Sequence, residues 1–349
     1  MQTAIILTGG LLDNISAKTA HGLIRGSERF QIIGIIDTHH AGKDAGEVLD
    51  GQKRNIPVYP DFEAFLSSGQ RADCCILGIA NAGGRLPDQL RPDIEKALRN
   101  GISVVSGMHE FLIDQPRLAE LAAAHGAQLI DVRRPKPASE LHFWSGAIDS
   151  VSCPIIAVMG TDCAVGKRTT AKFLVEEARS RGLKAEMIYT GQTGWMQGWK
   201  YGLVLDATLN DFVSGEIEHA IVSCFEAERP DVIFLEGQAA LRNPSGPCGS
   251  EFLVSGGADG VILVHPAGRT HYKGWADFNR VLPPVEEEME LVRMYGKPTL
   301  GIAVNTANMD ADTARSYQEE KEAGLGIPVV LPLKDGVAKL LDAILAVRK

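Results

Sequence analysis

Short apolar segments alternate with stretches of helical periodicity along most of the chain. In the first third, β-branched and other apolar residues are concentrated in residues 3–8, 31–37, 74–80, 102–107 and 127–133. Residues 88–101 and 109–126, which lie between these segments, carry apolar side chains at helical spacing instead. This alternation predicts parallel strands joined by helices that cover both faces of a sheet.

The same alternation returns in the second half of the chain. Its apolar segments span residues 155–158, 183–190, 231–237, 260–266, 299–306 and 327–332, and a final helical stretch spans 336–349. Residues 135–152 contain two prolines and no long period, so we interpret them as a connecting segment. We therefore predict an α/β protein with a Rossmann-like parallel-sheet domain in residues 1–134 and a P-loop NTPase-like α/β domain in residues 153–349.

The first strand of the second domain leads into a glycine-bounded loop. Residues 154–170 read PIIAVMGTDCAVGKRTT, and residues 170–181 then have helical periodicity. A strand, a glycine loop, a lysine and a helix start form an arrangement that binds phosphate through backbone N–H groups. The predicted phosphate-binding residues are Gly160, Thr161, Asp162, Cys163, Ala164, Val165, Gly166, Lys167, Arg168, Thr169 and Thr170.

The amino-acid sequence of this loop departs from the common phosphate-loop pattern. Five residues separate Gly160 from Gly166 where the common pattern has four, and Arg168 occupies the usual Ser or Thr position. GTDCAVGK resembles the GTD-x-x-VGKT loop of the dethiobiotin synthetase group, a resemblance that implies ATP and magnesium. Arg168 suits a second phosphate, or the 3′-phosphate of coenzyme A, better than a metal. If magnesium is used, Thr169 or Glu236 is its candidate ligand.

Composition and charge exclude several kinds of partner. The chain has 349 residues, of which 45% are hydrophobic and 23% charged, and its net charge is −9. This balance predicts a well-packed protein and argues against nucleic-acid binding, which requires a basic face. The N-terminus shows neither a basic leader nor a membrane span, and the six cysteines lack metal-ligand spacing. We expect a cytoplasmic protein with reduced thiols, no membrane partner and a homo-oligomeric assembly.

The strand ends of the first domain offer fewer candidates. Gly9 and Gly10 follow the first strand and Asp37 ends the second, but a third glycine at the spacing of a dinucleotide fingerprint is absent from the sequence. The sequence therefore gives little support for a nicotinamide cofactor. Arg85, beside two glycines, is a candidate for binding a substrate carboxylate, although a solvated loop arginine explains it equally well.

The strand ends of the second domain contain more residues that are candidates for catalysis or substrate binding. Glu236 ends a strand where P-loop proteins place an acid facing the phosphates, so it is a candidate magnesium ligand or general base. The strand ending at His265 leads into a loop with Arg269, His271 and Lys273. His265 and His271 are alternative bases, and Arg269 and Lys273 are candidates for carboxylate binding or oxyanion stabilisation.

Two further features complete the candidate site. Asn305 ends a strand where P-loop relatives often recognise the purine, so we assign it to base recognition. Residues 191–199, GQTGWMQGW, are rich in glycine and tryptophan and predict a mobile loop that acts as a lid or substrate clamp. Its predicted substrate-binding residues are Gln192, Thr193, Gly194 and Trp195.

Seven motifs together resemble those of one family. They read GIANAGGRLP, VVSGMHEFL, GTDCAVGKRTT, TGQTGWMQG, DFVSGEIE, LEGQAAL and HPAGRTHYKGW. This set resembles the D-glutamate N-acetyltransferase family from about residue 4 to the C-terminus. The resemblance implies transfer of an acetyl group from acetyl-CoA to the amino group of D-glutamate. The loop would then hold the pyrophosphate of the cofactor, with Lys167 and Arg168 neutralising its charge.

Two other classes of function remain open from the sequence. One is a ligase or kinase of the dethiobiotin synthetase kind that uses Mg-ATP. The GTD-x-x-VGK loop and Glu236 are both compatible with this class. The other is a non-catalytic nucleotide sensor in which the lid reports the bound ligand to a partner.

Overall fold

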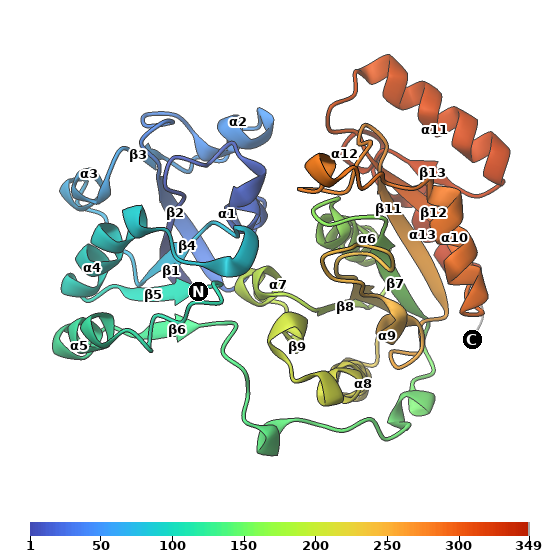
Figure 1. Cartoon of the computed structure of the whole chain (residues 1–349), viewed down its shortest axis with the longest axis horizontal. Helices are drawn as coiled ribbons and strands as arrows, with labels where there is room; N and C mark the ends of the chain where they lie inside the picture. Colours follow the sequence, from blue (N-terminus) through green and yellow to red (C-terminus); the bar gives the residue numbers. More distant parts are fainter. Residues whose placement is uncertain (348–349) are drawn as a thin grey trace. The chain divides into compact units, whose positions relative to one another are not determined.

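A computed structural model describes residues 1–347 of the chain (Figure 1). These residues form two compact units. Unit 1 contains Met1–Pro135 and Gln192–Trp199, and unit 2 contains Lys136–Gly191 together with residues 200–347. Each unit is built on its own parallel sheet, which confirms the predicted α/β class.

Unit 1 has a six-stranded parallel sheet in the order β3-β2-β1-β4-β5-β6. Its strands are β1 (Gln2–Leu7), β2 (Phe30–Ile36), β3 (Val58–Tyr59), β4 (Cys74–Leu77), β5 (Ser103–Ser106) and β6 (Leu129–Asp131). Its helices are α1 (Lys18–Ile24), α2 (Ala45–Asp50), α3 (Phe62–Ser67), α4 (Arg91–Arg99), α5 (Pro116–His125) and α7 (Gln192–Gln197). The strand order reverses between β1 and β4, as in Rossmann-like folds.

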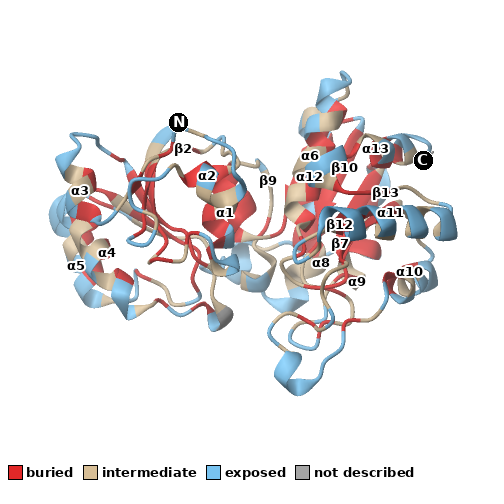
Figure 2. Cartoon of the chain, turned by 90° about the horizontal axis from the view of Figure 1, so that it is seen from above, coloured by how far each residue is buried: buried red, intermediate tan, exposed pale blue. Residues whose placement is uncertain are grey.

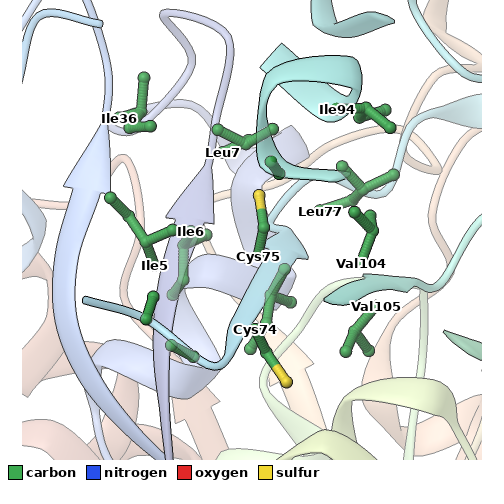
Figure 3. Close-up of a cluster of buried hydrophobic side chains, with 14 of the residues drawn as sticks. Ile5, Ile6, Leu7, Ile36, Cys74, Cys75, Leu77, Ile94, Val104 and Val105 are labelled. Atoms are coloured by element: carbon green, nitrogen blue, oxygen red, sulfur yellow. The ribbon is translucent and has the colours of Figure 1, made fainter. Parts of the chain in front are cut away.

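The core of unit 1 lies along β1, β4 and β5. Ile5, Ile6 and Leu7 of β1 have no exposed surface, and the same holds for Cys74 and Cys75 of β4 (Figure 3). Burial raises the pKa of the Cys74 thiol to about 11, so the side chain stays neutral and packs as a small apolar group. Strands that are buried on both faces explain the continuous apolar runs in the sequence.

Unit 2 has a seven-stranded parallel sheet in the order β13-β12-β11-β7-β10-β8-β9. Its strands are β7 (Ile155–Gly160), β8 (Ala185–Tyr189), β9 (Tyr201–Gly202), β10 (Val232–Glu236), β11 (Gly260–Pro266), β12 (Thr299–Asn305) and β13 (Val329–Val330). Its helices are α6 (Lys167–Ser180), α8 (Asn210–Glu228), α9 (Ser250–Leu253), α10 (Val285–Met294), α11 (Ala311–Leu325), α12 (Pro332–Asp335) and α13 (Ala338–Leu345). In both units most strand residues are buried, whereas β6 and β9 are partly buried, and the outer helix surfaces are exposed (Figure 2).

The helix ends follow local sequence signals. Helix α11 begins after Asp310, whose carboxylate accepts a hydrogen bond from the Thr313 N–H (2.8 Å). It ends at Gly326, which adopts the left-handed conformation with φ of 66°. An acidic residue before the first turn and a glycine after the last one satisfy groups that the helix leaves unpaired.

Candidate phosphate-binding site

The phosphate loop lies at the carboxyl end of β7, in the middle of the unit 2 sheet. Strand β7 pairs with β10 on one side and β11 on the other, and these two strands lead away to opposite edges of the sheet. Ligands of open parallel sheets bind at such a reversal of strand order. A Cβ atom on Gly160 would lie 2.8 Å from Val165 Cγ2 and 3.0 Å from the Val264 carbonyl oxygen, so the turn requires glycine here.

The backbone of the loop has the conformation of an anion cradle. Ala164 and Gly166 both have positive φ angles, of 52° and 107°. Alternation of left-handed and right-handed residues turns successive N–H groups towards one side of a loop. Helix α6 then begins at Lys167, three residues earlier than the periodicity predicted, so Arg168 and Thr169 lie in its first turn and Thr170 is buried behind them.

The ammonium group of Lys167 is buried inside the loop. Lys167 Nζ donates hydrogen bonds to the main-chain oxygens of Asp162 and Ala239, both at 2.7 Å. Burial lowers the pKa of Lys167, and the charges of neighbouring acids offset part of this effect. An anion in the loop would stabilise the protonated amine, which is the chemistry required of a phosphate-binding lysine.

The carboxylate of Asp162 has no exposed surface and accepts four hydrogen bonds. Oδ1 accepts from the Cys163 N–H (2.6 Å) and from Asn243 Nδ2 (2.8 Å). Oδ2 accepts from Arg269 Nη1 (2.5 Å) and from the Lys273 main-chain N–H (2.8 Å). Asn243 lies in no sequence motif that we could identify, and only the folded chain brings it to the phosphate loop.

The cationic segment that follows β11 thus lies against the phosphate loop. Arg269 Nη1 also donates to the Cys163 carbonyl oxygen (3.0 Å), which fixes the guanidinium. Burial lowers the pKa of Lys273, and the positive charge of Arg269 lowers it further. Two cations beside one buried carboxylate leave a net positive charge next to the loop.

The two candidate histidines lie in different surroundings. His265 is buried on β11, where its Nδ1 hydrogen-bonds to Thr161 Oγ1 (2.9 Å) and its ring stacks on that of Tyr317. Burial lowers the pKa of His265 to about 4, so its ring is neutral near pH 7. His271 lies in a hairpin-like turn after β11, and its ring nitrogens hydrogen-bond to Thr270 Oγ1 (3.0 Å) and Asn279 Oδ1 (3.3 Å).

Glu236 lies at the end of β10, which pairs with β7. The residue is buried, and its Oε2 accepts a hydrogen bond from the Thr190 N–H (3.0 Å). Thr190 Oγ1 donates to the Glu236 main-chain oxygen (2.7 Å) and accepts from Gln238 Nε2 (2.9 Å). Sequence reasoning missed Thr190, which binds the Glu236 carboxylate through its N–H, and Gln238, which binds the Thr190 hydroxyl. Such supporting hydrogen bonds leave no recognisable spacing in the sequence.

Asn305 supports the phosphate loop directly. Its Nδ2 donates to the Val165 carbonyl oxygen (2.8 Å), and its Oδ1 accepts from the Ala307 N–H (2.9 Å). The side chain that we assigned to purine recognition therefore forms hydrogen bonds with the main chain at Val165 and Ala307.

Residues 192–197 form a short helix, α7, where a mobile loop was expected. This helix packs within unit 1: Met196 is fully buried in the unit 1 core, and the Arg29 guanidinium lies 4.1 Å from the centre of the Trp195 ring. Thr193 Oγ1 hydrogen-bonds to Thr19 Oγ1 (3.2 Å). The loop interpretation was wrong because tertiary burial of Met196 outweighed the low helix propensity of the glycine.

The other substrate-binding candidates of unit 1 differ in exposure. Gln192 is buried and its Oε1 accepts a hydrogen bond from Arg133 Nη2 (2.9 Å), whereas Gly194 is buried within α7. Arg85 is exposed in the loop after β4. Unit 1 therefore holds Arg85, Gln192, Thr193, Gly194 and Trp195, and unit 2 holds the other candidates.

Asp37 is engaged within the turns of unit 1. Its buried carboxylate accepts hydrogen bonds from Thr8 Oγ1 (2.6 Å) and the Leu12 N–H (2.9 Å), and it contacts His40 Nδ1 (2.9 Å). A Cβ atom on Gly10 would lie 2.9 Å from the His39 ring, which thus covers the glycine turn. These contacts assign Asp37 to holding the turn together and add no support for a nicotinamide cofactor.

The fold and the loop define a class: a two-domain α/β protein with a Rossmann-like domain and a P-loop domain. Residues 142–341 match a family described as a domain of unknown function (DUF1611_C), P-loop domain, and residues 38–135 match its Rossmann-like N-terminal domain, DUF1611_N. The chain therefore belongs to the DUF1611, or D-glutamate N-acetyltransferase, family, which confirms the resemblance seen in its motifs.

Three relatives document this membership. A D-glutamate N-acetyltransferase from Tritonibacter scottomollicae is 35% identical over 79% of this chain and 82% of its own. One from a Pseudoalteromonas species is 30% identical over 76% of this chain and 79% of its own. A crystal structure of a DUF1611 family protein from Anabaena variabilis covers 99% of both chains, with 31% identity and a TM-score of 0.89.

Among residues 1–347, no helix combines the length and the apolar character needed to cross a bilayer.

Proposed function

We propose that this protein transfers the acetyl group of acetyl-CoA to the amino group of D-glutamate. The observation that carries the proposal is the match over 79% of the chain to a relative named D-glutamate N-acetyltransferase. The phosphate loop supports it, because acetyl-CoA presents a pyrophosphate and a 3′-phosphate that require such a cradle.

The loop residues supply what the phosphates of coenzyme A need. Backbone N–H groups of the loop and of the first turn of α6 would bind the anion, and Lys167 contributes a charge that two carbonyl oxygens hold in place. Arg168, in the first turn of α6, adds a second positive charge. No phosphoryl bond is broken in this reaction, so a serine or threonine directly after the lysine is not required.

The reaction needs a neutral amine next to the thioester. As the amine nitrogen attacks the carbonyl carbon, the C–N bond forms, the C–S bond breaks and the thiolate leaves, while a base accepts the proton from nitrogen. Glu236 is our proposed base, because it is buried at the strand end beside the phosphate loop. His265, with a pKa of about 4, is a weak acceptor for an ammonium proton.

The second function that specific residues favour is ATP-dependent ligation or phosphorylation. The GTD-x-x-VGK loop and Glu236 resemble the site of the dethiobiotin synthetase group, where Mg-ATP is the substrate. Thr169 or Glu236 would be its metal ligand in that case.

One experiment separates these functions from a non-catalytic sensor. The purified protein is incubated with acetyl-CoA and D-glutamate without ATP, and separately with Mg-ATP, and free thiol and ADP are measured. We expect stoichiometric release of thiol and formation of N-acetyl-D-glutamate in the first mixture. ADP without thiol would favour the ligase, and binding of coenzyme A without either product would favour the sensor.

A further inference from the structure

The carboxylate of Asp162 connects three separate segments of unit 2. Its partners belong to the phosphate loop, to the turn that contains Asn243 and to the segment after β11 that contains Arg269 and Lys273. The side chain is completely buried, and each of its two oxygens already accepts two hydrogen bonds. This geometry fits a residue that holds other groups in place, whereas the sequence suggested a direct contact with the cofactor.

The contacts of Asp162 indicate different roles for the two neighbouring cations, Arg269 and Lys273. The guanidinium of Arg269 is neutralised by Asp162 and fixed by the Cys163 carbonyl oxygen. The ammonium of Lys273 has no hydrogen bond or ion pair with any residue in the described range 1–347, although its main-chain N–H is bound to Asp162. Lys273 is therefore a partly buried cation whose backbone is fixed and whose charge is available to an anion.

We infer that Asp162 is a positioning residue for the proposed acetyl transfer. It fastens the segment 266–274 to the phosphate loop, so that the Lys273 ammonium faces a carboxylate group of the amino-acid substrate. This inference rests on the proposed function and assigns substrate binding to Lys273, while Arg269 has a supporting role. A carboxylate is a suitable partner for a desolvated ammonium, because the resulting ion pair forms charge-assisted hydrogen bonds.

The substitution Asp162→Asn tests this role with almost no change of shape. An asparagine has one acceptor oxygen and one NH2 group, so two of the four donors around position 162 would face another donor. The main-chain oxygen of residue 162, which holds Lys167, is retained. The substitution should therefore loosen the segment 266–274 more than it disturbs phosphate binding.

The kinetic test compares the Michaelis constants for the two substrates. We expect the KM for D-glutamate to rise about tenfold or more in Asp162→Asn, with the KM for acetyl-CoA changed by less than about threefold. Lys273→Met should give the same pattern. The double variant should be no worse than Lys273→Met alone, because residues that act through one another are not additive. Equal increases in both KM values, or additive effects, would overturn the inference.

Hydrogen–deuterium exchange gives a second readout that does not require activity. Peptides covering residues 266–282 should exchange faster in Asp162→Asn than in the wild-type protein. The matched control is Asp310→Asn, which removes an exposed carboxylate that accepts hydrogen bonds from Thr313, and it should change neither this exchange nor the KM values. Unchanged exchange in residues 266–282 would show that Asp162 does not fasten the segment, whatever the kinetics.

A further variant covers the case in which Asp162→Asn does not fold. Arg269→Gln removes the charged donor from the other side of the same contact and should give the same split between the two KM values. Equal effects on both KM values would again overturn the inference. If the wild-type protein releases no thiol with D-glutamate, the proposed function fails, and the exchange measurement still decides whether Asp162 fastens the segment.

Discussion

Buried ionisable side chains determine the chemistry available at the phosphate loop. Lys167, Glu236 and His265 all have less than a tenth of their surface exposed. In such surroundings a charge is stabilised only by specific partners, so the contacts of each group decide its protonation state. Lys167 is held by carbonyl oxygens, Glu236 by a main-chain N–H and His265 by a hydroxyl group.

The proposed role of Glu236 as the base leads to a prediction about turnover. Glu236→Gln keeps an oxygen that can accept from the Thr190 N–H but removes the proton acceptor. We expect kcat to fall about 10²- to 10⁴-fold while coenzyme A binds with nearly unchanged affinity, as measured by calorimetry. Glu228→Gln, which alters a surface contact with Lys200, is the matched control and should leave kcat unchanged. Loss of coenzyme A binding in Glu236→Gln would instead give Glu236 a structural role.

The burial of His265 leads to a prediction about stability and pH. Its pKa falls from 6.5 to about 4 on folding, so the unfolded chain takes up a proton at a higher pH than the folded one. The stability associated with the neutral ring is present above about pH 6.5 and is lost as the pH falls towards 4. Between about pH 7 and pH 5 this loss is about 2 kcal/mol.

Urea unfolding of the wild-type protein and of His265→Asn measures this contribution. Asparagine can still accept a hydrogen bond from Thr161 Oγ1 but does not titrate in this range. The variant should therefore lose less stability than the wild-type protein between the two pH values. An identical pH dependence in both proteins would contradict the prediction.

The elements around the loop are placed by the order of the strands. β7 lies between β10 and β11, so Glu236 and His265 reach the loop from strands that are distant in sequence but adjacent in the sheet. Helix α6 packs over β7, β8 and β10 and fixes the direction of the first-turn N–H groups. The turn between β7 and α6 consequently tolerates little change in its backbone.

Gly160 provides a test of this constraint. Gly160→Ala would place a methyl group 3.0 Å from the Val264 carbonyl oxygen, which belongs to the neighbouring strand. We expect a destabilisation of about 1–3 kcal/mol together with weaker binding of coenzyme A, measured by thermal unfolding and calorimetry. Gly324→Ala, in helix α11 with open space around the new methyl group, should be neutral or slightly stabilising. A Gly160→Ala protein that binds coenzyme A normally would contradict the assigned geometry of the loop.

In the molecule as a whole, the candidate residues are divided between two compact units. The phosphate loop and the segment after β11 belong to unit 2, whereas α7, whose neighbours in sequence belong to unit 2, is part of unit 1. A ligand that binds only the native state stabilises the segments it contacts. Binding of coenzyme A should therefore slow hydrogen exchange in the segments that contact it more than in the rest of the chain.

Hydrogen exchange in the presence of coenzyme A measures this effect. We expect slower exchange in residues 160–170 and 266–274, because a ligand at one hundred times its dissociation constant adds about 2.7 kcal/mol to the stability of its site. The buried strands β1 and β4 of unit 1 serve as the internal control and should not change. Protection confined to unit 1 would contradict the assignment of the phosphates to the loop.

The α/β class, the strand that leads into the phosphate loop and the family could all be inferred from the amino-acid sequence alone. These features depend on local patterns: apolar runs, glycines where φ is positive, and a lysine at a helix start. The tertiary structure alone decided that residues 192–197 are helical in unit 1, and that Asn243, Thr190 and Gln238 support the site. It also showed that the carboxylate of Asp162 is buried and accepts hydrogen bonds from three segments of the chain. Such roles arise from burial and from contacts between residues far apart in the chain, which local patterns do not encode.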